Sequence, residues 1–80
     1  MKEDIRILAD DAKRLKNDEA FQTFITKVRD DQMTVFANSA ASDVEVREEA
    51  HAMLRALNQI SGTLDAAIAA EAILDRKRRN

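Results

Sequence analysis

The chain has 80 residues, of which 45% are hydrophobic and 35% are charged, and its formal net charge is −2. It contains one Gly and neither Pro nor Cys, which excludes disulfides, thiol catalysis and zinc–thiolate sites and leaves few residues that would interrupt a helix. The sequence holds no run of about 18 apolar residues that could span a membrane, so we expect a soluble, all-α protein with a single domain over residues 1–80.

The first predicted helix covers about residues 3–16. Its apolar residues recur at the three- and four-residue spacing of an amphipathic helix: Ile5, Leu8, Ala12 and Leu15. Asn17, Asp18 and Glu19 follow. Asp18 is a favourable N-cap, and the helix dipole favours the carboxylate of Glu19 in the first turn of a new helix. The pattern leaves open whether this break is a turn or a kink.

The second predicted helix covers about residues 19–37. Its apolar stripe is interrupted at Asp31 and Gln32 and contains all three aromatic residues of the chain. The members of this stripe are Phe21, Phe24, Ile25, Val28, Val35 and Phe36. Because the phenylalanines share a helical spacing with aliphatic residues, we expect them in the core rather than exposed as a platform on which nucleic-acid bases stack.

The third predicted helix covers about residues 43–77, after a small, polar turn at residues 38–43. Ser42 and Glu45 have the spacing of a capping box at its start. Beyond them, apolar residues alternate at spacings of four and three, which is the heptad pattern of a coiled coil. This seam consists of Val46, Ala50, Met53, Leu57, Ile60, Leu64 and Ala67. The alternation fails at Glu71.

Together the helices predict a long antiparallel, coiled-coil-like helical hairpin preceded by a short N-terminal helix. Two helices alone would expose much of this apolar surface, so either the first helix covers the open end of the hairpin or other copies of the chain do. We expect a homo-oligomer of undetermined copy number. Its predicted self-association residues are Phe21, Ile25, Val28, Met53, Leu57, Ile60 and Leu64.

Catalytic and metal-binding patterns are weak. Glu48 and His51 have the Glu-x-x-His spacing of di-iron carboxylate bundles, but the heptad pattern turns both side chains away from the seam, so an exposed histidine is the favoured interpretation. Adjacent acids such as Asp10 and Asp11 point to different sides of a helix, which is not the geometry of an acid–base pair. We therefore expect neither an enzyme nor a cofactor.

Charge is unevenly distributed. Residues 1–75 hold 9 basic and 15 acidic side chains, a net −6, and the tail adds +4. The tail, residues 76–80, carries Arg76, Lys77, Arg78 and Arg79. These cations complement the dipole of a helix C-terminus, and they also suit contact with an acidic protein surface. The acidic remainder argues against nucleic-acid binding except through this tail.

Two sets of short motifs carry a family resemblance. Leu15-Lys16-Asn17-Asp18-Glu19-Ala20-Phe21-Gln22 is followed, after a helix, by Asn38-Ser39, Asp43, Arg47-Glu48-Glu49-Ala50 and Leu54-Arg55-Ala56-Leu57. Over about residues 15–70 this arrangement resembles a group of small helical proteins that tailed bacteriophages and prophages encode among their virion structural genes. That group often has a large aromatic residue where this chain has His51. The resemblance implies a phage context and an assembly role, and it supplies no catalytic residues.

Three functional hypotheses follow. The first is a non-enzymatic virion accessory or assembly protein, such as a capsid, portal or scaffold-type module, which self-associates and contacts a phage structural protein through its basic tail. The second is a small phage regulator or inhibitor that binds one host protein through its acidic face. The third is a metal-binding half-bundle that uses Glu48 and His51. The first two place the protein in the virion or the host cytoplasm.

Overall fold

The computed structural model describes residues 2–79, with side chains up to residue 78. Three helices make up almost all of this part of the chain, and it contains no strand: α1 (Lys2–Asn17), α2 (Glu19–Asn38) and α3 (Val44–Arg79). The predicted all-α fold is confirmed. Each observed boundary lies within two residues of the predicted one.

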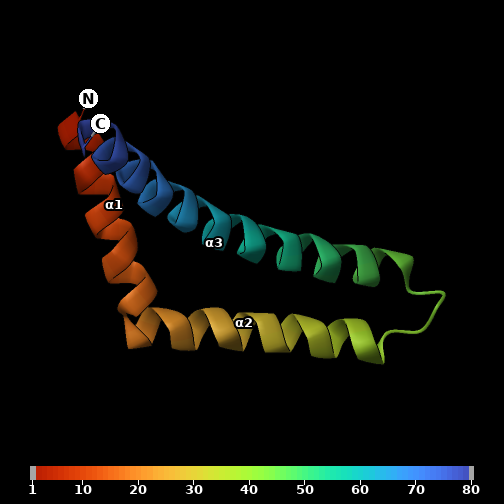
Figure 1. Cartoon of the computed structure of the whole chain (residues 1–80). Helices are drawn as coiled ribbons and strands as arrows, with labels where there is room; N and C mark the ends of the chain where they lie inside the picture. The colour runs from red at the N-terminus through yellow and green to blue at the C-terminus, as the bar shows by residue number, and fades with distance from the viewer. Residues whose placement is uncertain (1, 80) are drawn as a thin grey trace.

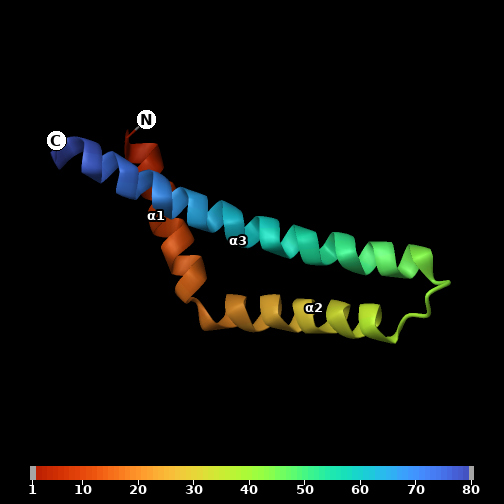
Figure 2. The ribbon, with the colours of Figure 1, turned by 45° about the vertical axis from the view of Figure 1, so that its right-hand side comes forward.

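The molecule is elongated, with principal extents of 56 × 23 × 17 Å. Figure 1 shows α2 and the first half of α3 as a hairpin closed by residues 39–43, and α1 turning away from α2 to meet the second half of α3. The start of α1 and the end of α3 lie at the same end of the molecule (Figure 2). Helix α2 therefore runs antiparallel to the first half of α3, and α1 runs in the opposite chain direction to the second half at an incline to it (Figures 1 and 2).

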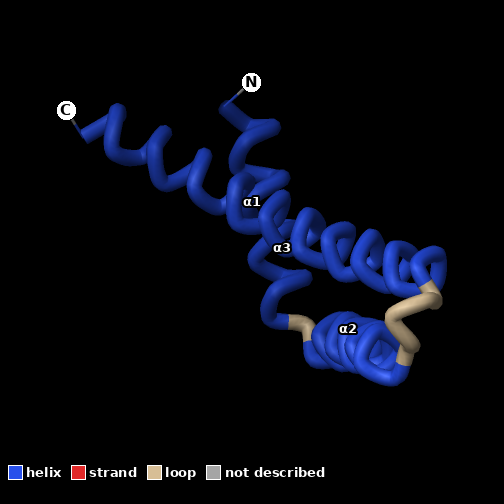
Figure 3. Tube along the Cα trace, turned by 90° about the vertical axis from the view of Figure 1, so that its right-hand side faces the viewer, coloured by secondary structure: helices blue, strands red, loops and turns tan. Residues whose placement is uncertain are grey.

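The break between α1 and α2 is a turn in which Asp18 is the one non-helical residue. Its φ of −81° and ψ of 116° are extended, and its side chain accepts a hydrogen bond of 2.7 Å from the backbone N–H of Phe21. Figure 3 shows the steep change of direction between the two helices at this point. The predicted N-cap is confirmed, and residues 2–79 form three helices rather than a kinked pair.

The loop between α2 and α3 differs by one residue from the predicted capping box. The backbone N–H of Arg47 donates to the carbonyl of Asp43 at 3.0 Å, so Asp43 occupies the N-cap position that the sequence pattern gave to Ser42. The Asp43 carboxylate accepts from the backbone N–H of Ala40 at 3.0 Å. The Asp43 carboxylate therefore bonds back to the loop that precedes α3.

The buried apolar core is thin and consists of Ala9, Ala12, Ala50 and Leu57. Two small residues, Ala9 and Ala12, form the contact side of α1, and small side chains let helices approach closely. The expectation that all three phenylalanines belong to the core was wrong. Phe21 is half-buried, whereas Phe24 is 67% and Phe36 38% exposed. Phe24 stands beside the inward-facing position of Ile25, which is half-buried, and Phe36 lies in the last turn of α2.

Candidate protein–protein interface

The predicted seam of α3 divides into an inner and an outer part. Ala50 and Leu57 are buried, and Leu64 is half-buried. The intervening members Val46, Met53 and Ile60 are 44%, 44% and 43% exposed. Because they recur every seven residues, or about two turns, these three side chains follow one line along α3. We call Val46, Met53 and Ile60 the α3 stripe.

A second exposed apolar line runs along α2. Phe24 and Val35 are 67% and 40% exposed, and a separation of eleven residues, about three turns, places them on one side of the helix. Phe24 precedes the inward-facing Ile25 by one position, just as Met53 precedes the inward-facing Leu54. In antiparallel helices an offset of the same sense turns both side chains to the same side of the pair. Phe24 and Val35 therefore share one surface with the α3 stripe, and we call these five residues the open face.

Next to the open face, α2 and α3 enclose a hollow of about 230 Å³. Phe21 and Ile25 of α2 line it together with Ile60 and Leu64 of α3. The structure thus brings together four of the predicted self-association residues from the two helices. Leu57 is only 5% exposed, and Val28 is half-buried, so these two stabilise the hairpin within one chain and offer little area to a partner.

A network of ion pairs holds α1 against α3. The carboxylate of Glu71, which is 9% exposed, accepts from Lys13 Nζ at 2.6 Å and lies 3.6 Å from Arg6. Arg6 also donates to Asp75 at 2.7 Å. The hydrogen bond to Glu71 raises the pKa of Lys13, and the hydrogen bond to Asp75 raises the pKa of Arg6. Sequence reasoning missed this network, although the failure of the heptad at Glu71 marked its position.

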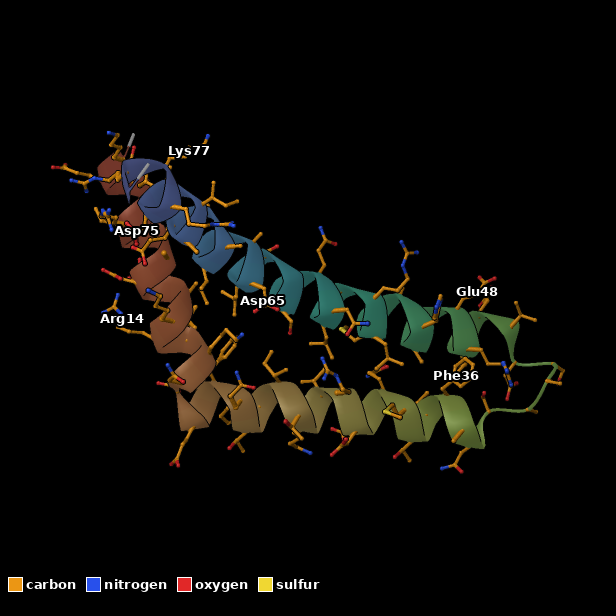
Figure 4. The ribbon with its side chains drawn as sticks, viewed as in Figure 1. Arg14, Phe36, Glu48, Asp65, Asp75 and Lys77 are labelled. Carbon is orange, nitrogen blue, oxygen red and sulfur yellow. The ribbon has the colours of Figure 1, made fainter. Side chains whose placement is uncertain are left out.

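The two ends of α3 carry opposite charge. Glu45, Glu48 and Glu49 are exposed at its start, and we call them the acidic end. Arg76, Lys77 and Arg78 are exposed at its last turns, and we call them the basic end. Figure 4 shows Glu48 and Lys77 at opposite ends of the helix. Helix α3 extends to Arg79, whose side chain lies outside the described residues.

The structure does not bring Glu48 and His51 into a metal site within the described residues. Glu48 and His51 are both exposed, beside a shallow hollow that they line with Phe36, Val44 and Arg47. Within residues 2–78, no three His, Cys, Asp or Glu side chains are grouped so that they could hold a metal ion. The Arg47 guanidinium instead lies 4.5 Å from the centre of the Phe36 ring, a cation–π contact that stabilises the end of the hairpin.

Comparisons with protein families, curated proteins and solved structures find no match. None of the described helices has the length and apolarity needed to cross a membrane. The open face gathers five exposed large apolar side chains on one side of the hairpin. It offers aliphatic and aromatic area, and its binding chemistry is therefore the burial of apolar surface against another protein.

Proposed function

We propose that this chain is a non-enzymatic interaction module that self-associates through its open face. The observation that carries the proposal is the exposure of five large apolar side chains on one side of the hairpin, with Phe24 67% exposed. Monomeric soluble proteins rarely leave contiguous apolar patches of more than a few hundred Å² in water. Full burial of one such side chain contributes about 1.5–3 kcal/mol, so covering several of them can hold copies together.

The phage resemblance gives the proposal its biological context. We propose an accessory or assembly role in the virion of a tailed phage, in the capsid, at the portal or as a scaffold-type module. Self-association supports such a role because assembly proteins act as multiple copies. The exposed cations of the basic end then suit contact with an acidic phage structural protein. In this role the protein needs no cofactor, and it is present in the virion or the host cytoplasm.

Light scattering on a sizing column tests self-association directly. Detection must use refractive index because the chain has no Tyr or Trp. We expect a defined multiple of the 9.0 kDa chain mass that persists when the protein is diluted tenfold. A monomer at all concentrations would overturn the proposal.

A pair of methionine variants assigns the association to the open face. Met53, on the open face, is 44% exposed, and Met33, on another side of α2, is 55% exposed. Met53→Glu should reduce the mass towards that of one chain, because association would bury a carboxylate in an apolar contact. Met33→Glu should leave the mass unchanged. Equal effects of the two variants would exclude the open face as the interface.

The second candidate is a small regulator that binds a basic surface of one host protein. It is favoured by the excess of acid in residues 1–75, with 15 acidic against 9 basic side chains. A monomeric mass together with one stoichiometric host protein, retained on the immobilised chain and released by salt, would support this candidate over the first.

A further inference from the structure

We infer that a second copy of the chain covers the open face with its α3 antiparallel to the first, so that the basic end of each copy lies beside the acidic end of the other. This inference rests on the proposed self-association and adds the partner and its orientation. Two observations carry it: on the side of α3 that bears the open face, α1 covers only the C-terminal half, and the ends of α3 carry opposite charge.

The first observation concerns the two halves of α3. Over its C-terminal half, α1 packs on α3 and covers Ala67, Ile68 and Glu71, which are half-buried or buried. Met53 and Ile60 continue the line of Ala67 towards the N-terminus at the same spacing of seven, but they are 44% and 43% exposed. In an antiparallel pair, the α1-covered half of one copy lies opposite the uncovered half of the other. Each copy then supplies the helix that the other lacks.

Two leucines that flank the contact side of α1 suit this contact. Leu8 and Leu15 are 61% and 41% exposed, and their separation of seven residues matches that of Met53 and Ile60. Two apolar ridges of equal spacing can interdigitate as knobs into holes. The exposed leucines of one copy therefore have a counterpart on the open face of the other.

The second observation selects the orientation. The acidic end and the basic end each present three exposed side chains of one sign, and the structure gives neither set an ion pair among the described residues. A parallel pair would place the two basic ends side by side, where like charges repel. An antiparallel pair instead forms two complementary contacts related by a two-fold axis. That axis crosses α3 midway between the two ends, near residues 61 and 62.

Spin labels test the orientation in solution, because a chain without cysteine accepts a single cysteine at any chosen site. Gln59 and His51 are exposed on α3 outside the open face. In the inferred pair, labels on Gln59→Cys are offset by only about 8 Å along the helix axis. Labels on His51→Cys are offset by about 30 Å along the helix axis, at about 1.5 Å per residue. The expected result is a short distance between copies at residue 59 and a distinctly longer one at residue 51.

The other outcomes are equally informative. Short distances at both positions would show a parallel pair and overturn the inference, while the proposed self-association would survive. Broad distances, together with a mass that grows with concentration, would show open head-to-tail chains and overturn the inference as well. A mass of one chain without dipolar coupling would overturn the proposed function itself.

A charge exchange tests the complementarity of the ends independently. The first variant reverses the basic end: Arg76→Glu, Lys77→Glu and Arg78→Glu. The second adds reversal of the acidic end: Glu45→Lys, Glu48→Lys and Glu49→Lys. We expect the first variant to weaken association by about tenfold at low salt, since exposed ion pairs are individually weak, and the second to recover most of the loss. Helicity is followed in parallel because both changes oppose the helix dipole. Equal association of all three proteins would overturn the inferred contact.

Discussion

Lys13 and Glu71 are separated by 58 positions in the sequence, yet Lys13 Nζ donates to the Glu71 carboxylate at 2.6 Å. This contact lies beside the alanine side of α1, where Ala9 and Ala12 are 0% and 2% exposed. Alanine methyl groups bury little apolar area. The packing of α1 on α3 therefore depends more on ion pairs than the packing of α2 on α3 does.

We expect Glu71→Ala to loosen α1 from α3. The substitution removes the acceptor of the Lys13 hydrogen bond and an ion-pair partner of Arg6. Because Lys13 and Arg6 are themselves 47% and 36% exposed, water takes over part of their charge stabilisation and the loss is modest. The melting temperature should fall by up to about 4–8 °C, which is the shift that a domain of 60–100 residues shows when its free energy of unfolding drops by about 1 kcal/mol. Glu48→Gln removes an exposed carboxylate and is the control, with an expected change near zero. Equal melting temperatures of the two variants would contradict the assigned role of Glu71.

The same contact predicts a loss of stability at alkaline pH. The pKa of Lys13 is raised above its ordinary value of 10.5, chiefly by the hydrogen bond to Glu71. A raised folded-state pKa means that the folded state binds the proton more tightly than the unfolded state. The contribution is therefore fully present below pH 10.5 and is lost as pH rises through the folded-state pKa. Thermal unfolding followed by circular dichroism from pH 9 to about 12 measures this loss.

A charge-preserving variant isolates Lys13 from the other lysines. Lys13→Arg keeps a cation opposite Glu71 throughout that range, because a guanidinium stays protonated. Its melting temperature should therefore decline less steeply with pH than that of the unmodified chain. Parallel declines in the two proteins would show that Lys13 does not contribute to the alkaline loss.

The residues that the sequence predicts well are those whose signals are local. The cap at Asp18 needs only the next three residues, and the helix boundaries follow from periods of three and four. The Lys13–Glu71 and Arg6–Asp75 contacts join residues 58 and 69 positions apart, and no local pattern encodes such distances. Pairing of α1 with α3 therefore could not be predicted from periodicity.

The inner line of α3 illustrates a second limit. It passes through Leu54 and Ile68 but also through Arg47 and Asp75, all of which are half-buried. Because the inner line contains polar residues, its apolar pattern is less regular than that of the neighbouring line of Val46, Met53 and Ile60. The heptad pattern therefore predicts that Val46, Met53 and Ile60 are buried, although they are exposed. An apolar line of a helix reliably predicts its buried side only when no neighbouring line is buried instead. Here the neighbouring line is buried although it contains charged side chains, because charged groups can be buried where they have partners.

Replacement of the Asp18 cap should destabilise the junction of α1 and α2. Asp18→Ala removes the acceptor of the 2.7 Å hydrogen bond from the Phe21 N–H and should cost about 1 kcal/mol of the free energy of unfolding in urea. Asp18→Asn keeps a capping oxygen and should remain close to the unmodified chain. If the Asn variant lost as much stability as the Ala variant, the negative charge rather than the hydrogen bond would be the stabilising feature.

Gly62 offers a prediction of opposite sign. It lies inside the 36-residue helix α3, where glycine is less favourable than alanine by about 0.8–1 kcal/mol because its backbone loses more freedom on folding. A Cβ built at this position meets nothing within 4 Å, so the added methyl group has no steric cost within the chain.

Gly62→Ala should therefore raise the free energy of unfolding by up to about 1 kcal/mol. Urea unfolding at a fixed chain concentration measures the gain, since association also shifts apparent stability. The mass in solution separates two causes of failure. A variant with unchanged stability and unchanged mass would show that α3 is frayed near residue 62. A variant that loses both stability and mass would show that a second copy approaches the backbone at Gly62, on a side of α3 other than the open face.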